Sequence, residues 1–312
     1  MDNKIVSISS KKIADFFELN YFGRDIRIFR PTTEKKILND SIFFITNLNK
    51  NKIAELKKFK NVYLLLSSKV DRSKINLDCP YSICDNPRDT FFKIVEEFFF
   101  TKKSISKTFI HPTAHIGEDV KIGKNVFIDR DVFIEGPCKV GNGCHISSKC
   151  IILGKCEIGA STHLSTEVLI GEETLSLRKE NKLFKNNKHI GGVIIGKNCR
   201  IGSRSLISKG TINDTVIKNN VILAEKVLIA HNVEIEKNTV VTVGSTVCGS
   251  AEIGENCWLG PHCLIMNHVK IFSDIKIAAG STLFSNAEKK GTYIGNPAKI
   301  IKIKDKKNES FY

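Results

Sequence analysis

The stretch IGEDVKIGKNVFIDRDVFIEGPCKVGNGCHISSKCIILGKCEIG, residues 116–159, places an aliphatic side chain at every sixth position from Ile116 to Ile158. This period fits neither an α-helix, which repeats about every 3.6 residues, nor a strand, which alternates. It is the period of a hexapeptide β-helix. The same pattern continues to residue 170, resumes over 195–207 and, after a slip, runs over 217–283. We therefore predict a mainly β protein, a left-handed parallel β-helix with a small N-terminal α/β domain.

Two further positions of the repeat support this fold. The residue after the aliphatic position is often glycine, as at Gly117, Gly123 and Gly141, and we expect glycine to provide the backbone angles of the corners. Four positions after the aliphatic residue comes a small side chain, filled by seven of the ten cysteines: Cys138, Cys144, Cys150, Cys156, Cys199, Cys257 and Cys263. Because these cysteines follow the repeat and form no CxxC pair, we predict that they pack in the core and bind no metal.

Three hexapeptides would form one triangular coil, and the strands of successive coils would lie about 4.8 Å apart. About eight coils would then give a prism about 40 Å tall. Its flat faces favour side-by-side association with closed symmetry, so we expect a homotrimer.

The sequence divides into four segments. Residues 1–100 lack the period of six and mix short apolar strands at 42–45 and 62–66 with helices, one at 13–19 and one after Asn86 and Pro87. We assign 1–100 to a small α/β domain, 101–109 to a linker, 110–299 to the β-helix and 300–312 to a basic tail that frays.

The composition indicates where in the cell the protein is located and which partners it could bind. No window approaches the roughly 20 apolar residues of a membrane span, and the N-terminus has no signal-peptide core, so we expect a soluble cytoplasmic protein. The ten cysteines suit a reducing compartment. The formal net charge of +15 fits an acidic partner, such as a nucleotide-sugar diphosphate or an acidic carrier protein, and equally a lysine-rich genome. No nucleic-acid-binding motif is present, so we expect no nucleic-acid partner.

The repeat is interrupted twice, shortly before the segment IAHNV at 229–233. Residues 171–194 form a long, charged insertion that ends near His189. A second, shorter slip lies between Ile207 and Ile217 and contains Lys209. Long loops in compact solenoids usually carry function, although a tolerated surface insertion is the alternative.

Several motifs together resemble the bacterial UDP-3-O-acylglucosamine N-acyltransferases of lipid A biosynthesis. TVIKNNVILAEKVLIAHNVEIEKNT at 215–239 resembles the active-site region of that family. The ends of its β-helix are matched by HPTAHIGEDVKIG at 111–123 and GTYIGNPA at 291–298. Its small uridine-binding domain is matched by KIADFFELNYFG at 12–23, DSIFFITN at 40–47 and NPRDTFF at 86–92. The hexapeptides are shared by many transferases, whereas this combination is more specific.

The resemblance implies that His231 is the catalytic base and that His268 is a second active-site histidine. Independent chemistry agrees for His231, because an amine that attacks a thioester must lose a proton and imidazole is suited to accept it near neutral pH. His268 would orient groups or stabilise the tetrahedral oxyanion. For either histidine the alternative is an ordinary polar surface residue.

The same resemblance implies that Phe44 stacks on a uracil and that Asn47 hydrogen-bonds it. We also expect Asn232, Lys209 and His189 to bind substrate. Phe44 and Asn47 would otherwise be ordinary strand and turn residues.

The sequence also departs from that family. Ala224 and Leu228 stand where an acidic residue and a glutamine are usual, and no C-terminal helices for acyl carrier protein follow residue 299. Our main hypothesis is an N-acyltransferase that acts on a UDP-amino sugar with acyl carrier protein or acyl-CoA as donor. The phosphopantetheine thioester would be a substrate, and no tightly bound cofactor would be needed.

Three alternatives remain open. The end of the chain, NPAKI at 296–300, also resembles acetyl-CoA-dependent nucleotide-sugar N- or O-acetyltransferases. A metal-dependent β-helix hydratase would use His231, His262 and His268 as ligands. A non-catalytic relative is suggested by Ala224 and Leu228.

Overall fold

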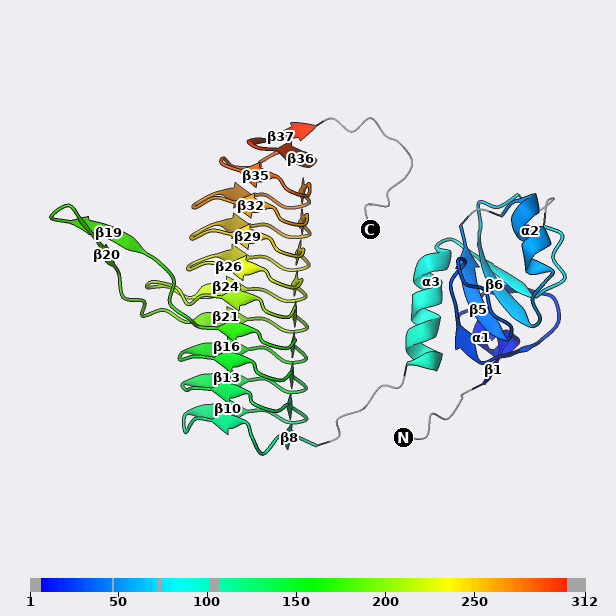
Figure 1. Ribbon diagram of the computed structural model, residues 1–312, viewed down its shortest axis with the longest axis horizontal. Helices are drawn as coiled ribbons and strands as arrows, with labels where there is room; N and C mark the ends of the chain where they lie inside the picture. Colours follow the sequence, from blue (N-terminus) through cyan, green and yellow to red (C-terminus); the bar gives the residue numbers. More distant parts are fainter. Residues whose placement is uncertain (1–6, 47, 72–74, 101–106, 302–312) are drawn as a thin grey trace. The chain divides into compact units, whose positions relative to one another are not determined.

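The computed structural model describes residues 7–46, 48–71, 75–100 and 107–301 (Figure 1). The chain divides into two compact units, Met1–Ser104 and Ile105–Tyr312. Most of the predicted linker, 101–109, and the tail from residue 302 lie outside the described residues. The predicted tail at 300–312 begins too early, because Ala298–Ile301 form strand β37, which pairs with β36 at Thr292–Gly295.

The N-terminal unit is built on a five-stranded sheet in the order β2-β7-β6-β5-β4, in which only β2 is antiparallel to its neighbour. Its strands are β2 Asn20–Phe22, β4 Arg30–Pro31, β5 Ser41–Ile45, β6 Val62–Ser67 and β7 Tyr81–Cys84. A separate pair consists of β1 Ile8–Ser9 and β3 Arg27–Ile28. The helices are α1 Ser10–Phe16, α2 Lys50–Leu56 and α3 Pro87–Ile94, which continues as a π-turn at Val95–Phe99.

The helix starts follow from capping chemistry. Asn86 accepts a hydrogen bond from the Asp89 N–H and Pro87 occupies the first turn, so the predicted start of α3 is confirmed. The first helix begins earlier than its apolar pattern suggests, at Ser10 instead of Ile13, because Ser9 caps it by accepting from the Lys12 N–H.

The C-terminal unit is the predicted left-handed parallel β-helix, with three sheets that form the sides of a prism (Figure 1). The eight-stranded sheet contains β10 Val120–Ile122, β13 Cys138–Val140, β16 Cys156–Ile158, β21 Val193–Ile195, β24 Thr215–Ile217, β27 Glu234–Ile235, β30 Glu252–Ile253 and β33 Lys270–Ile271. The nine-stranded sheet contains β9 His115–Ile116, β12 Phe133–Ile134, β15 Ile151–Ile152, β18 Leu169–Ile170, β23 Leu206–Ile207, β26 Leu228–Ile229, β29 Thr246–Val247, β32 Leu264–Ile265 and β35 Thr282–Leu283. The eleven-stranded sheet contains β8 Phe109–Ile110, β11 Phe127–Ile128, β14 His145–Ile146, β17 His163–Leu164, β22 Arg200–Ile201, β25 Ile222–Leu223, β28 Val240–Val241, β31 Trp258–Leu259, β34 Lys276–Ile277, β36 and β37.

The repeat positions form the core of the prism. From Ile128 onward every aliphatic residue of the repeat is buried, and so are all seven cysteines of the small-residue position. Burial raises the pKa of these thiols, for example to about 12 for Cys138, so they remain neutral and pack as small apolar groups. Several donate to a carbonyl of the next coil, as Cys144 Sγ does to the Gly159 oxygen at 3.1 Å.

Most glycines of the repeat have a different role from the one predicted, whereas Gly171 has left-handed angles, with φ 88°. The left-handed backbone angles occur two positions after the glycine, at residues such as Asn125 (φ 57°) and Asn198 (φ 57°). At Gly159 a Cβ would lie 2.4 Å from the carbonyl carbon of Gly196 in the next coil. Glycine is therefore needed because adjacent coils approach too closely for a side chain.

The register of strand pairing shows how much chain each interruption loops out. Partners in successive coils are normally separated by three hexapeptides of sequence, as for Phe127 and His145. Cys156 instead pairs with Val193, so the first interruption loops out slightly more chain than one full coil would use. Val193 pairs with Thr215, so the second interruption loops out less than one hexapeptide. The first contains an additional hairpin of β19 Leu177–Glu180 and β20 Leu183–Asn186, which projects from the prism (Figure 1).

An outward aromatic stack runs along the eleven-stranded sheet. The ring centroids of Phe127 and His145, and of His145 and His163, lie 4.6 Å apart. Desolvation, with smaller effects from His145 and Arg200, lowers the pKa of His163 to about 4. His163 is therefore neutral in the folded protein over the range where an unfolded histidine becomes protonated.

This stack predicts a loss of stability in acid. Between about pH 6.5 and 4 the unfolded chain binds a proton at His163 that the folded chain does not, so the free energy of unfolding falls as the pH falls through this window. For a half-exposed side chain we expect the effect to be about 1 kcal/mol at pH 5. Thermal unfolding at pH 7.5 and 5 should show a smaller loss for His163→Phe than for the wild type, and an equal loss would contradict this assignment.

Candidate functional site

Both interruptions and the IAHNV segment lie at one corner of the prism, where the chain passes from the nine-stranded to the eight-stranded sheet. We call this the insertion corner. The insertion lies between β18 and β21, the slip between β23 and β24, and His231 between β26 and β27. These are consecutive coils, so segments that are well separated in sequence become neighbours along the prism.

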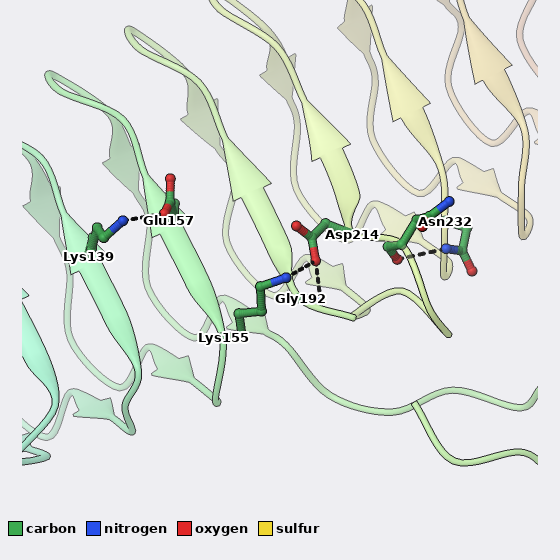
Figure 2. Close-up of polar contacts among 7 residues, drawn as sticks. Lys139, Lys155, Glu157, Gly192, Asp214 and Asn232 are labelled. Carbon is green, nitrogen blue, oxygen red and sulfur yellow. Dashed lines mark hydrogen bonds and ion pairs between the residues drawn. The ribbon is translucent and has the colours of Figure 1, made fainter. Parts of the chain in front are cut away.

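A hydrogen bond from the backbone joins the insertion to the slip, and an ion pair joins the slip to Lys155, which precedes β16 (Figure 2). Asp214 in the slip accepts hydrogen bonds from Lys155 Nζ at 2.8 Å and from the Gly192 N–H at 2.7 Å. Both hydrogen bonds lower the pKa of Asp214, and the one from Lys155 has the larger effect. The base of the insertion is thus fixed to the slip at neutral pH.

A second set of contacts involves two of the predicted substrate-binding residues. Lys209 Nζ lies 3.1 Å from Glu173 Oε1, and this contact lowers the pKa of Glu173. The Lys209 carbonyl lies 3.2 Å from Nδ1 of His189. Because a carbonyl only accepts, Nδ1 of His189 carries a proton and donates it to this oxygen. The side chains of Lys209 and His189 therefore organise the root of the insertion.

His189 packs directly against His231. The two rings meet edge to face, with centroids 5.5 Å apart, and His189 is only 5% exposed. Among the described residues, three buried side-chain polar atoms lack a hydrogen-bond partner: Thr174 Oγ1, His189 Nε2 and Ser208 Oγ. All three belong to the two interruptions or border them. Unpaired buried polar atoms are costly, and functional sites are where they are tolerated.

Asn232 holds the slip against the His231 turn. Its Oδ1 accepts from the N–H and the Oγ1 of Thr211 at 3.0 and 2.7 Å, and its Nδ2 donates to the Asn213 carbonyl at 2.8 Å. Asn232 also has left-handed backbone angles, with φ 61°, which asparagine tolerates well. These contacts favour a positioning role over the predicted direct contact with substrate.

The same contacts determine the tautomer of His231. The backbone partners fix the Asn232 amide orientation, so its Oδ1 is an acceptor. His231 Nδ1 lies 3.2 Å from that oxygen and must therefore be the protonated nitrogen. Nε2 of neutral His231 consequently carries a free lone pair that can accept a proton.

The His231 ring lies over a glycine of the next coil. A Cβ at Gly249 would lie 2.7 Å from His231 Nε2 and 2.6 Å from Cε1, so only glycine leaves room for this ring position. No acceptor for the Gly249 N–H occurs among the described residues. The sequence analysis did not identify Gly249, although its position three hexapeptides after His231, one full coil, could have indicated it.

His268 also lies at the insertion corner, between β32 and β33, two coils from His231, or about 10 Å at the usual strand spacing. Its N–H donates to the Gly249 carbonyl at 3.1 Å, and its φ is 60°. His262 also has left-handed angles, but it lies between β31 and β32, at a different corner. The three histidines of the metal hypothesis therefore do not converge, and no cluster of metal-ligating side chains occurs in the described part of the chain.

The predicted nucleotide-binding residues belong to the N-terminal unit. Phe44 lies in β5, with its ring 5.4 Å from that of Phe91 in α3. Both line a groove of about 1060 Å³ that also includes Phe92, Lys52 and Arg88. Asn47 lies outside the described residues.

Family models match two segments of the β-helix. Residues 119–154 match the bacterial transferase hexapeptide (six repeats), and residues 192–224 match the hexapeptide repeat of succinyl-transferase. No curated protein matches the chain.

Solved acyltransferases share the fold. UDP-N-acetylglucosamine acyltransferase from Campylobacter jejuni is 26% identical, with a TM-score of 0.55 over 62% of this chain and 74% of that one. The O-acyltransferase for UDP-N-acetylglucosamine from Moraxella catarrhalis is 23% identical, with a TM-score of 0.56 over 62% and 73%. The UDP-N-acetylglucosamine acyltransferase from Francisella novicida is 21% identical, with a TM-score of 0.54 over 59% and 66%.

The chain is therefore a β-solenoid that contains transferase hexapeptide repeats over residues 119–154 and 192–224, and its fold is similar to that of the Campylobacter acyltransferase. The similarity to hexapeptide-repeat acyltransferases agrees with the sequence analysis, whereas the narrower resemblance to N-acyltransferases stays a prediction. The Moraxella structure carries the name of an O-acyltransferase, and none of these three is named an N-acyltransferase. No helix in the described ranges is long and apolar enough to cross a bilayer.

Proposed function

We propose that this protein transfers an acyl group from a phosphopantetheine thioester to the amine of a UDP-amino sugar, with His231 as general base. The observation that carries the proposal is the contact of His231 Nδ1 with Asn232 Oδ1 at 3.2 Å, which makes Nε2 the basic nitrogen of the neutral ring. The donor is acyl carrier protein or acyl-CoA, and no tightly bound cofactor takes part.

In the proposed reaction, Nε2 of His231 removes a proton from the amine as it attacks the thioester carbonyl. The C–N bond forms, and the carbonyl oxygen becomes an oxyanion. The His231 ring lies over Gly249, and we propose that the Gly249 N–H supplies a hydrogen bond to that oxygen. The intermediate then collapses, the C–S bond breaks, and the imidazolium returns the proton to the departing thiolate. His268 contacts the substrate further along the same corner.

We propose that the N-terminal unit binds the uridine diphosphate part of the substrate. Phe44, Phe91 and Phe92 offer aromatic surface for a uracil, and Lys35 and Arg88 bring positive charge to the same groove. Lys52 is already paired with Glu34 and Glu55, which also line the groove. Asn47 is proposed to hydrogen-bond the uracil. A Phe44→Ala variant that leaves the KM for the nucleotide sugar unchanged would remove this part of the proposal.

A donor and acceptor screen tests the function. The purified protein would be incubated with acetyl-CoA, longer acyl-CoA and acyl carrier protein thioesters, each with UDP-amino sugars and with UDP-N-acetylglucosamine, and products detected by mass. We expect one pair to give an acylated product. No product from any pair would sink the transferase proposal.

An O-acyltransferase is the second candidate, because the matched Campylobacter structure is named an acyltransferase of UDP-N-acetylglucosamine. The amine of that sugar already carries an acetyl group, so a hydroxyl would be the nucleophile and the mechanism would otherwise be the same. Mild alkali separates the two outcomes, since it cleaves an ester product and leaves an amide intact. An acetyl-CoA-dependent reaction is distinguished by the donor arm of the screen.

The outer faces of the prism support the proposed homotrimer. The outward side chains of the nine-stranded sheet are mainly apolar and include Phe133 and Ile151, which are 38% and 40% exposed. By contrast, the eight-stranded sheet carries ion pairs such as Lys139 with Glu157 and Lys270 with Glu252. Apolar faces favour contact with further copies, and charged faces favour water.

This contrast predicts the effect of a charge on each face. Ile151→Glu should shift the protein toward single protomers in light scattering, because it places a carboxylate in the proposed interface. Glu234→Lys, on the eight-stranded sheet, is the matched control and should leave the mass unchanged. A wild-type protein that is already a single protomer would remove the trimer from the proposal.

A further inference from the structure

The hairpin of the insertion ends in an exposed tip. Strands β19 and β20 are joined by Asn181 and Lys182, which have φ of 50° and 67°, as a two-residue turn of type I′ requires. In Figure 1 the hairpin projects well away from the coils of the prism. A two-stranded hairpin is only marginally stable in water by itself, so a binding partner for it is physically reasonable.

Apolar side chains occupy both faces of this tip. In the antiparallel register Lys179 is opposite Phe184 and Glu180 is opposite Leu183. Because neighbouring side chains in a strand point to opposite faces, Leu183 and Phe184 lie on different faces. They are 65% and 72% exposed. A hairpin that packs flat on a protein surface needs one apolar face, whereas a tip that enters an apolar medium benefits from two.

The hairpin is also strongly basic. Residues 175–188 contain Arg178 and four lysines but a single carboxylate, Glu180. That carboxylate lies 3.5 Å from Arg178 and 3.0 Å from Lys185. Lys179 lies over the Phe184 ring at 5.9 Å, and Lys182 and Lys188 form no ion pair with the described residues. The tip therefore combines apolar side chains with cations that outnumber their anionic partners.

We propose that this hairpin tip inserts into an anionic lipid surface, with Leu183 and Phe184 in the acyl region and the lysines against the headgroup charge. Apolar side chains flanked by lysine are the combination that interfacial membrane binding uses. The proposal does not depend on the acyltransferase assignment.

The base of the hairpin connects the proposed lipid contact to the candidate functional site at the insertion corner. His189, at the end of the insertion, is buried against His231, and Gly192 is fixed to Asp214. The hairpin thus leaves the prism at the insertion corner, which also carries His231. Lipid binding would therefore place that corner next to the membrane surface.

The test is co-sedimentation of the full chain with vesicles. We expect binding to vesicles of equal parts phosphatidylglycerol and phosphatidylcholine, little binding to pure phosphatidylcholine, and at least a tenfold loss of binding in about 0.5 M salt. The double variant Leu183→Ser, Phe184→Ser should bind at least tenfold more weakly while its thermal unfolding stays unchanged, because the tip contributes nothing to the core. Phe284→Ser, which changes an exposed phenylalanine elsewhere, is the control and should bind as the wild type does.

Two results would overturn the proposal. Absence of binding to the anionic vesicles would do so directly. Equal binding by the wild type and the tip variant would show that the overall charge, not the hairpin, attracts the lipid. If the tip instead governed binding to purified acyl carrier protein, with no vesicle binding, the occupant would be an acidic protein and the lipid assignment would be wrong.

Discussion

The His231→Ala variant is expected to lose turnover by a factor of about 10²–10⁴, which is the usual contribution of a positioned general base. Nε2 of His231 is the lone pair that the Asn232 contact leaves free, and no other described side chain occupies its place over Gly249. The loss should appear in kcat, because the proposed nucleotide contacts lie in the N-terminal unit. It would be measured in steady-state assays with the substrate pair that the screen identifies.

Two controls separate catalysis from folding in this experiment. His262→Ala removes the same side chain from a different corner and should retain most of the activity. Added imidazole should restore part of the activity of His231→Ala, since the deletion leaves space over Gly249. A His231→Ala enzyme that keeps a third or more of the wild-type rate would show that another group accepts the proton. A wild-type protein without turnover would favour the non-catalytic relative.

The fold was accessible from sequence because each repeat position has a simple physical requirement. Aliphatic side chains such as Ile229 must point inward at every sixth residue, and cysteines such as Cys144 must be small enough for the corner. What pattern alone could not supply was the reason for the glycines. Gly159 is required by the backbone of the neighbouring coil at Gly196, a contact between residues on either side of the long insertion.

The sequence analysis did not predict strand β37, because this strand also depends on backbone contacts. The segment after Pro297 reads as a basic tail, yet residues 298–301 pair with β36 through the backbone. Backbone hydrogen bonds depend little on side-chain identity, so composition gives no warning of them. The β-helix therefore extends to Ile301 rather than ending at the predicted residue 299.

The candidate site was only partly accessible. The interruptions could be identified because they break a regular pattern, and His231 because its segment resembles the active-site region of a known family. The geometry that links them depends on the offset between coils, since it brings His189, Lys209 and Asn232 to one corner from three different turns. Asn232 illustrates what the sequence could not predict. We expected it to bind substrate, whereas its side chain contacts Thr211, Asn213 and His231.

Replacing Gly249 with alanine tests whether the position of the His231 ring, rather than its presence, carries the activity. The new Cβ would lie 2.6 Å from His231 Cε1, so the ring must move, while the Gly249 N–H is retained. Since a displacement of about 1 Å can cost a hundredfold in rate, we expect kcat to fall by about 10–100-fold. Thermal unfolding should change little, because Gly249 lacks left-handed angles and the ring is at the surface of the coil.

Gly244→Ala is the matched control for this experiment, because its Cβ would lie 2.4 Å from Cε1 of His262 at another corner. Gly244 has φ 68°, so alanine there should cost about 1 kcal/mol of stability through backbone strain. The two variants are thus expected to behave oppositely: Gly249→Ala is folded and slow, whereas Gly244→Ala is less stable and fully active. Equal losses of activity in both would mean that any disturbance of the coils impairs the enzyme, and the specific role of the His231 position would be wrong.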